Sequence, residues 1–156
     1  MSQTRCRRAS WWVALVGVLS GCGGPAESLH PDEAAAVAAI RKLGGKVEFD
    51  AERRAIKVHL HATAVQNDDL VLLAKLPNLQ NLSLGKTQIG DDGLAHLAGC
   101  ARLETLSLNS TNVTDSGLKP LMKLVNLKTL NVQETKVSRA GSAQLRRALP
   151  DLKVSP

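Results

Sequence analysis

Residues 103–121 read LETLSLNSTNVTDSGLKPL, and this stretch decides the fold because its pattern recurs every 24 residues. The recurring unit has the form L-x-x-L-x-L-x-x-T, followed by an aliphatic residue, a glycine and a last leucine. It occupies residues 79–97, 103–121 and 127–145, with aligned positions Leu79, Leu103 and Leu127; Leu82, Leu106 and Leu130; Leu84, Leu108 and Val132; Thr87, Thr111 and Thr135; Ile89, Val113 and Val137; Gly93, Gly117 and Gly141; Leu97, Leu121 and Leu145. A constant period over so many positions predicts a solenoid of stacked units.

Each unit predicts a short strand, a turn and a short helix. Leu106 and Leu108 are two residues apart, so they point to the same side of an extended strand. From Val113 to Leu121 the apolar positions are three apart, which suits a helical turn. A single unit cannot bury its apolar face, so the stacked units are expected to share one leucine core.

The frame extends more weakly in both directions. Upstream, six positions match in type, namely Val58, Leu60, Thr63, Val65, Leu70 and Leu73, while Ala55 replaces the first leucine and Asp69 falls where glycine is expected. Downstream, Ser142 replaces a leucine and Arg139 an aspartate. These positions predict three clear repeats and one degraded repeat.

The ending Val113-Thr114-Asp115-Ser116-Gly117-Leu118 resembles the V-T-D-x-G-L variant of the leucine-rich repeat family, which is related to its cysteine-containing subfamily. Threonine stands here where that subfamily often has cysteine or asparagine. Its hydroxyl can bond to backbone in the turn, so a stacked ladder of threonines is expected. The resemblance covers about residues 55–149. It implies an α/β solenoid with a short curved parallel sheet and convex helices, but it leaves function open because the family is defined by its core.

A cap is predicted at the N-terminal end of the solenoid, and a last strand-like edge at its C-terminal end. Pro31 to Ile40 reads as a helix with acids in its first turn, ended by Gly44-Gly45. Residues 46–49 are expected to form a strand, 50–54 a turn and 56–60 the first solenoid strand. Residues 31–54 therefore form an N-terminal helix and β-hairpin cap, 55–156 the repeat domain, and 149–154 a last strand-like edge.

The first 22 residues predict export and lipid attachment. Arg5, Arg7 and Arg8 precede the apolar stretch 11–19, which is short for a bilayer span. Leu19-Ser20-Gly21-Cys22 resembles the lipobox of bacterial lipoproteins, in which the leader is cut before a cysteine that then carries lipid such as palmitate. We therefore expect a signal peptide over 1–21, lipidated Cys22 and a tether over 22–30. An ordinary secretory signal and a retained membrane anchor are the alternatives.

The composition after cleavage bears on partners and location. Loss of three arginines leaves 17 basic and 14 acidic residues, a formal charge of +3. Phe49 is then the only aromatic residue, so no basic stripe has aromatic residues interleaved with it. This pattern gives no case for nucleic acid binding. Residue 23 is Gly rather than Asp, and in this the chain resembles lipoproteins that are sorted to the outer membrane. The tether can extend the domain at most about 30 Å from the lipid. The domain is expected to stay near a membrane in the cell envelope.

The third cysteine, Cys100, would have no partner in the cleaved chain, because Cys6 leaves with the leader and Cys22 is modified. It aligns with Leu76 and Leu124, so we expect a buried thiol that packs as a small hydrophobe. A reactive thiol is the alternative.

In the leucine-rich repeat family the concave sheet face is the usual partner surface. That resemblance assigns to it Lys57, His59, His61, Asn81, Ser83, Gly85, Lys86, Thr105, Ser107, Asn109, Ser110, Thr129, Asn131, Gln133 and Glu134. The side chains are small, polar and mostly uncharged, and they lack the Tyr, Trp and Arg anchors of protein hot spots. The face is either simply solvated or a hydrogen-bonding surface for protein or glycan.

Two local clusters raise the question of metal binding or catalysis. His59 and His61 are two apart on a strand and could share a metal ion with Glu48, but no third ligand has clear spacing. Acids at 68–69, 91–92 and 115 begin the convex helices, where capping of exposed amides is expected, with calcium binding or acid–base chemistry as the alternative. We expect no cofactor and no enzyme activity.

The sequence thus predicts a lipid-anchored envelope protein whose repeat domain binds or scaffolds another protein. A cell-wall or glycan-binding module is the second hypothesis, and a metal-dependent enzyme using His59 and His61 is the third. The partner, the biological process and the oligomeric state stay open.

Overall fold

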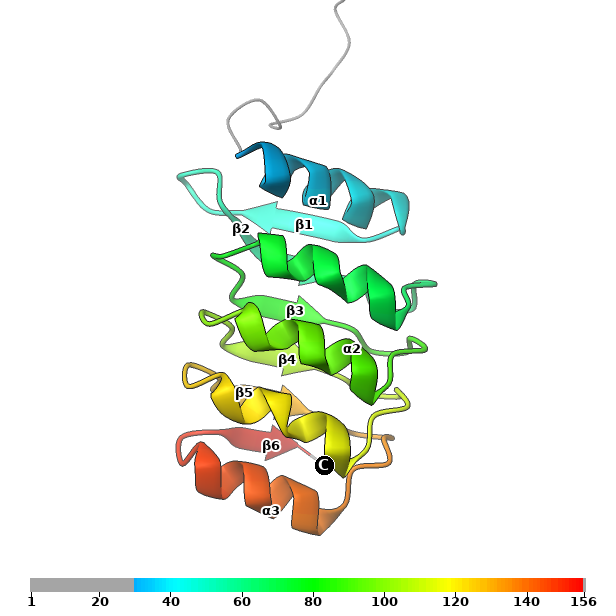
Figure 1. Cartoon of the computed structure of the whole chain (residues 1–156), viewed down its shortest axis with the longest axis vertical. Coiled ribbons are helices and arrows are strands. Elements are labelled where there is room, and N and C mark those ends of the chain that lie inside the picture. The colour runs from blue at the N-terminus through cyan, green and yellow to red at the C-terminus, as the bar shows by residue number, and fades with distance from the viewer. Residues whose placement is uncertain (1–29, 156) are drawn as a thin grey trace, which may run out of the picture.

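A six-stranded sheet runs the length of the computed structural model, which describes residues 30–155 (Figure 1). The strands follow one another across the sheet in chain order: β1 (Lys46–Phe49), β2 (Ala55–His59), β3 (Asn81–Ser83), β4 (Thr105–Ser107), β5 (Thr129–Asn131) and β6 (Lys153–Ser155). β1 is antiparallel to β2, and all later pairs are parallel. The expected cap hairpin and solenoid sheet are both present.

The register of the sheet advances by one repeat per strand. Val58 pairs with Leu82, Leu82 with Leu106, Leu106 with Leu130, and Leu130 with Val154. The degraded first unit is therefore a full turn of the solenoid, and its positions 58, 60, 65, 70 and 73 are at most 1% exposed. The period also reaches β6, one turn beyond the last clear repeat.

The helices cover one face of the sheet (Figure 1). They are α1 (Pro31–Lys42), η2 (Asn67–Lys75), α2 (Asp91–Ala95), η3 (His96–Gly99), η4 (Asp115–Leu118), η5 (Pro120–Lys123) and α3 (Arg139–Ala148). Four of the seven, η2, η3, η4 and η5, are 3₁₀ helices, which have three residues per turn. Pro120, which has no N–H, begins η5 within the third unit.

The core lies between the sheet and these helices and consists almost wholly of aliphatic side chains. The framework leucines Leu79, Leu103 and Leu106 are fully buried, and Leu127 is 2% exposed. α1 closes the N-terminal end with Val37 and Ile40, which are 3% and 1% exposed. Burial of each leucine stabilises the fold by roughly 1.5–3 kcal/mol relative to exposure.

The expected threonine ladder is present in every unit. The hydroxyls of Thr63, Thr87, Thr111 and Thr135 each donate to the carbonyl three residues earlier, at 2.6–2.7 Å. The residue before each threonine has φ = 55°, the left-handed region that is uncommon outside glycine. The hydroxyl thus closes a tight turn at the end of each strand, at Ala62, Lys86, Ser110 and Glu134.

A second ladder joins the starts of the convex helices, and here the expected capping holds for Asp69 but is wrong for Asp91 and Asp115. The Asp91 carboxylate accepts from the backbone N–H and the hydroxyl of Thr114, at 2.7 and 2.6 Å. Asp115 accepts from Ser138 in the same two ways, at 2.7 and 2.6 Å. These carboxylates bond the N-cap residue of the next repeat, which stacking brings within hydrogen-bond distance. Asp69 alone follows the expectation, because its carboxylate accepts from the N–H of Gln66, the N-cap of its own helix.

The second ladder also explains the recurring glycine. A Cβ added at Gly117 would meet the Asp91 carboxylate, and one at Gly141 would meet Asp115, at distances that real side chains do not adopt. The departures at the two ends follow from the same packing. Asp69 can replace glycine because α1, the helix before it, lies outside the 24-residue frame and supplies no aligned aspartate. Arg139 can replace aspartate because no described helix lies beyond α3.

The predicted signal peptide, Cys22 and nearly all of the tether lie outside the described residues. Within residues 30–155, no helix has the length and apolar character needed to cross a membrane.

Candidate interaction surface

Two rows of side chains cross the face of the sheet that lies away from the helices, which we name the concave face. The register places residues 57, 81, 105 and 129 side by side in one row, and residues 59, 83, 107 and 131 in the other. They alternate with buried Val58, Leu82, Leu106 and Leu130, so they face solvent. A third row, at the strand ends, is His61, Gly85, Asn109 and Gln133. The structure therefore brings the predicted residues of this face together.

Charge on the concave face is concentrated at its N-terminal end. Glu48 on β1 lies opposite Lys57, and its carboxylate is 2.9 Å from Lys57 Nζ and 3.2 Å from His59 Nε2. The hydrogen bond and charge of Lys57 hold the pKa of Glu48 below its usual value, with a smaller contribution from His59. All three side chains are about half exposed, so the cluster remains accessible to solvent.

This arrangement bears on the metal hypothesis for His59 and His61. The register does bring Glu48 to His59, but Lys57 places a cation on the same carboxylate. His61 lies beyond the end of β2, where its Nδ1 atom is 2.7 Å from the position that a Cβ on Gly85 would take. No group of three His, Cys, Asp or Glu side chains among residues 30–155 is arranged to hold a metal ion.

The middle of the concave face is neutral and held by short hydrogen bonds. Ser107 Oγ donates to Asn109 Oδ1 at 2.9 Å, and Asn109 Oδ1 leans over Gly85 from the opposite side to His61. Asn131 Oδ1 accepts from the backbone N–H of Gln133 at 3.0 Å. Asn109 and Asn131 are thereby oriented before any partner binds, which lowers the entropic cost of a contact.

The edge of this face carries two residues that lie outside the rows. Lys86 occupies the left-handed turn after Gly85 and is exposed. Ser110, in the equivalent turn of the next repeat, donates its hydroxyl to Glu134.

The concave face also includes residues on β1 and β6 that were not predicted from the sequence. Lys46 pairs with His59 at the N-terminal end, and Lys153 and Ser155 on β6 pair with Thr129 and Asn131 at the other. The alternation of residues 46–49 and the 24-residue offset from 129–131 to 153–155 are the signals that could have identified them.

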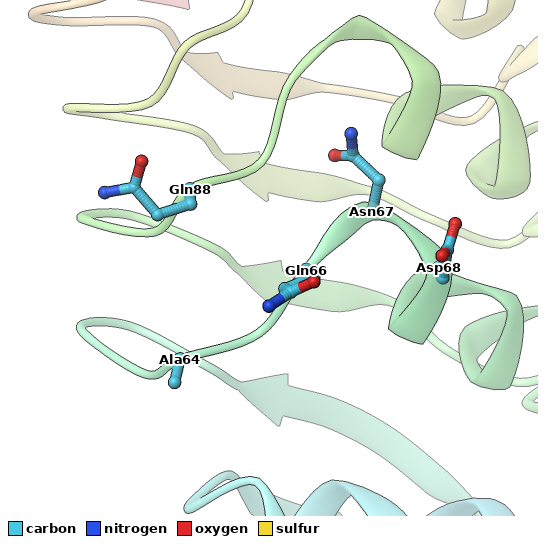
Figure 2. A pocket seen from close by; sticks show the side chains of 5 residues that line it. All are labelled: Ala64, Gln66, Asn67, Asp68 and Gln88. Atoms are coloured by element: carbon cyan, nitrogen blue, oxygen red, sulfur yellow. The ribbon is translucent and has the colours of Figure 1, made fainter.

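A shallow hollow of about 450 Å³ lies where the first two units turn from sheet to helix, lined by Ala64, Gln66, Asn67, Asp68 and Gln88 (Figure 2). It marks a gap in the second ladder. Asn67 Oδ1 accepts from the N–H of Gly90, but Gly90 has no hydroxyl to make the second bond that Thr114 and Ser138 make. The side-chain amides and the carboxylate that line this hollow can hydrogen-bond a polar ligand.

Cys100 is 2% exposed and directs its thiol at the carbonyl of Leu73, 3.6 Å away. Burial raises the pKa of this thiol to about 11, so almost no reactive thiolate forms at neutral pH. The expected buried thiol is confirmed.

The chain matches one family model and is similar to several solved structures. The family model described as Leucine Rich repeat matches residues 75–98 and 99–122. Among solved structures, the chain is similar to internalin C2 from Listeria monocytogenes (36% identity, TM-score 0.46), covering 54% of this chain and 34% of that chain. It is also similar to Chaetomium Mex67:Mtr2 subunits (19%, TM-score 0.46, 56% and 64% covered). A leucine-rich repeat protein of Leptospira interrogans is similar too (19%, TM-score 0.41, 55% and 27% covered).

The chain thus spans about a third of the length of the internalin C2 chain. A search of curated proteins found no match. The matched repeats and the parallel sheet of 24-residue turns together identify a protein with the leucine-rich repeat fold, in which residues 75–122 are two repeats of the Leucine Rich repeat family.

Proposed function

We propose that this chain is a bacterial lipoprotein of the cell envelope whose leucine-rich repeat domain binds another protein through its concave face. Leucine-rich repeat domains typically mediate protein–protein interaction and are generally not enzymes. The observation that carries the proposal is the set of aligned, accessible polar rows across β2 to β5. Serine and asparagine hydroxyls and amides in these rows are already oriented, as Ser107, Asn109 and Asn131 show.

The chemistry of these rows indicates the kind of partner. The central strands carry neutral hydrogen-bonding groups, while the Glu48–Lys57–His59 cluster lies at one end. A partner is expected to align along the rows by hydrogen bonds and to place a charged group at the cluster. Without large aromatic or Arg side chains in the rows, affinity is expected to be modest.

The test is affinity capture from envelope extract with the full chain and with a triple variant, Ser107→Lys, Asn109→Lys and Asn131→Lys. A matched control places three lysines at exposed alanines away from the concave face: Ala38→Lys, Ala74→Lys and Ala101→Lys. A protein bound by the wild type and the control but lost with the triple variant supports the proposal. Equal recovery by all three baits contradicts it.

The lipid anchor rests on the lipobox-like ending at Cys22 and is tested separately. Growth with an alkyne-tagged fatty acid should label the wild-type chain and leave Cys22→Ala unlabelled. Equal labelling of both chains, or no labelling of either, would rule out Cys22 as the lipidation site. Fractionation of the labelled chain between inner and outer membranes tests the outer-membrane assignment.

A glycan-binding module is the second candidate, and the oriented amides of Asn109 and Asn131 are the observation that favours it. Amides of this kind can bond vicinal hydroxyls of a sugar. Retention on insoluble peptidoglycan that resists salt and is lost in the triple lysine variant would favour this candidate over a protein partner.

A further inference from the structure

The positive charge of the chain is gathered in its C-terminal quarter. Residues 119–156 contain eight Lys or Arg and two Asp or Glu, whereas residues 30–118 contain nine basic and eleven acidic residues. A formal charge of +6 in the last 38 residues therefore follows a formal charge of −2 in the preceding 89. The leucine frame specifies none of these charges, since it uses only the inward positions.

Six of these cations form what we name the C-terminal basic patch: Lys119, Lys123, Lys136, Arg139, Arg146 and Arg147. All six are exposed, and within residues 30–155 none of them forms an ion pair. Of the other two cations, Lys128 is paired with Glu104 at 2.8 Å, and Lys153 lies on the concave face beside Thr129. Charge that is not neutralised internally is available to an outside partner.

The patch lies on adjoining elements. η5 and α3 are neighbouring helices on the convex face at the C-terminal end of the solenoid (Figure 1). Arg146 turns from α3 toward the outer edge of β6, where its Nη2 atom donates to the carbonyl of Val154 at 3.1 Å. The cations therefore extend from the convex helices to the outer edge of the terminal strand.

Two apolar features lie among the cations of the C-terminal basic patch. Val125, in the loop after η5, is 77% exposed and is flanked in sequence by Lys123 and Lys128. Lys119 and Lys123 also border a shallow hollow of about 350 Å³ whose other lining residues are Ala95, Ala98 and Pro120. Cations around an exposed valine suit a layer of anionic head groups above hydrocarbon, whereas a discrete soluble ligand would need a built pocket.

We propose that the C-terminal basic patch docks the convex side of the domain on an anionic membrane surface. Phosphate groups of the lipid would lie against Lys119, Lys123 and the arginines of α3, with Val125 placed between the head groups. This surface is separate from the concave face, and the proposal does not depend on a protein partner there. Clusters of four to eight Lys or Arg near a bilayer typically have this role.

The experiment follows hydrogen–deuterium exchange of the full chain with vesicles of phosphatidylcholine alone or with added phosphatidylglycerol. The short helices over 115–124 and residues 139–155 should exchange more slowly with the anionic vesicles and not with the neutral ones. Raising the salt to about 1 M shortens the screening length to about 3 Å and should remove the effect. This local readout distinguishes docking of the patch from any attachment through residues 1–29.

Two variants with equal change in net charge decide whether position matters. Lys119→Glu, Lys123→Glu and Arg147→Glu should abolish the protection at the lipid concentration that protects the wild type, and should raise the concentration needed for it by at least about tenfold. Lys42→Glu, Lys75→Glu and Lys86→Glu change exposed cations elsewhere and should leave the protection in place. Far-UV circular dichroism checks folding, and glutamine at the same three positions is used if the glutamate variant unfolds.

Three results would overturn the proposal. They are equal protection with neutral and anionic vesicles, equal loss in the two variants, and protection of the same helices by poly-glutamate but not by anionic vesicles. The last would identify an acidic polypeptide as the occupant of the patch.

Discussion

Replacement of Gly117 by alanine should destabilise the solenoid, because the new methyl group would press on the carboxylate of Asp91. A Cβ at this position would lie 3.0 Å from Asp91 Cγ and 3.1 Å from its Cα, and closer still to Oδ1. Movement of the Asp91 side chain away from the methyl group would cost free energy, because its two oxygens accept hydrogen bonds of 2.7 and 2.6 Å from Thr114. Overpacking of this kind costs about 1–3 kcal/mol, and the gain in helix propensity returns up to about 1 kcal/mol. We expect a net loss of about 1–2 kcal/mol.

A double-mutant cycle isolates this contact. Asp91→Ala should by itself cost about 2 kcal/mol, because two bonds to a charged acceptor are lost at a partly buried site. In the double variant the carboxylate is gone, and only the Cα of residue 91 remains close to the new methyl group. Gly117→Ala and Asp91→Ala together should therefore cost about 1 kcal/mol less than the sum of the single changes.

The measurement is urea unfolding followed by far-UV circular dichroism, since Phe49 is the only aromatic residue within residues 30–155. Gly99→Ala is the matched control, because a Cβ there meets nothing within 4 Å. It should be neutral or stabilise by about 0.4–1 kcal/mol through the unfolded state. Additive free energies in the cycle, or an equal cost at Gly99, would refute the ladder as the reason for the recurring glycine.

Four further changes test other parts of the structure. Leu106→Ala should cost about 2–5 kcal/mol in urea unfolding, because Leu106 is fully buried in the core, and an unchanged midpoint would contradict the frame. Cys100 should react with maleimide only after denaturation, and fast labelling of the folded chain would contradict its burial. The bonds from Ser138 lower the pKa of Asp115, so this carboxylate stabilises the fold above its unfolded pKa near 3.8 and loses that effect as pH falls through the folded value. The stability difference between wild type and Asp115→Asn should therefore shrink in acid, and a difference independent of pH would exclude this linkage. Gly90→Thr combined with Asn67→Asp should add the missing second bond of the ladder and stabilise by about 1 kcal/mol, more than either change alone.

The fold could be predicted from sequence because the core repeats at one spacing. A position such as Leu106 has the same neighbours in each turn of the solenoid, so Val58 and Leu60 could be assigned from Leu82 and Leu84 despite the missing first leucine. The roles of Asp91 and Asp115 could not be assigned in this way. Their partners lie 23 residues further along the chain, and local helix capping was the simpler interpretation of an acid at a helix start.

The concave rows were predictable for a related reason, since residues that alternate with buried leucines must face outward. The ends of the face were not predicted, because β1 runs antiparallel and β6 follows the last clear repeat. Whether the rows bind a partner is a separate question. Their residues contribute little to the core, so the frame places no restriction on their identity.

The core also does not restrict which outward-facing positions carry charge, so the uneven distribution of charge calls for an explanation other than folding. Outward positions on the convex helices and on the strands are equally unconstrained by the core. The central concave rows are nevertheless neutral, whereas the C-terminal basic patch holds six cations that form no ion pair within residues 30–155. Folding does not require this separation, and mutual repulsion among the cations opposes it. A domain docked through its convex basic patch would leave the concave rows directed away from that surface and open to a partner. The two proposed contacts are therefore compatible in one orientation, and a partner captured on the concave face should still bind when the domain is held on anionic vesicles.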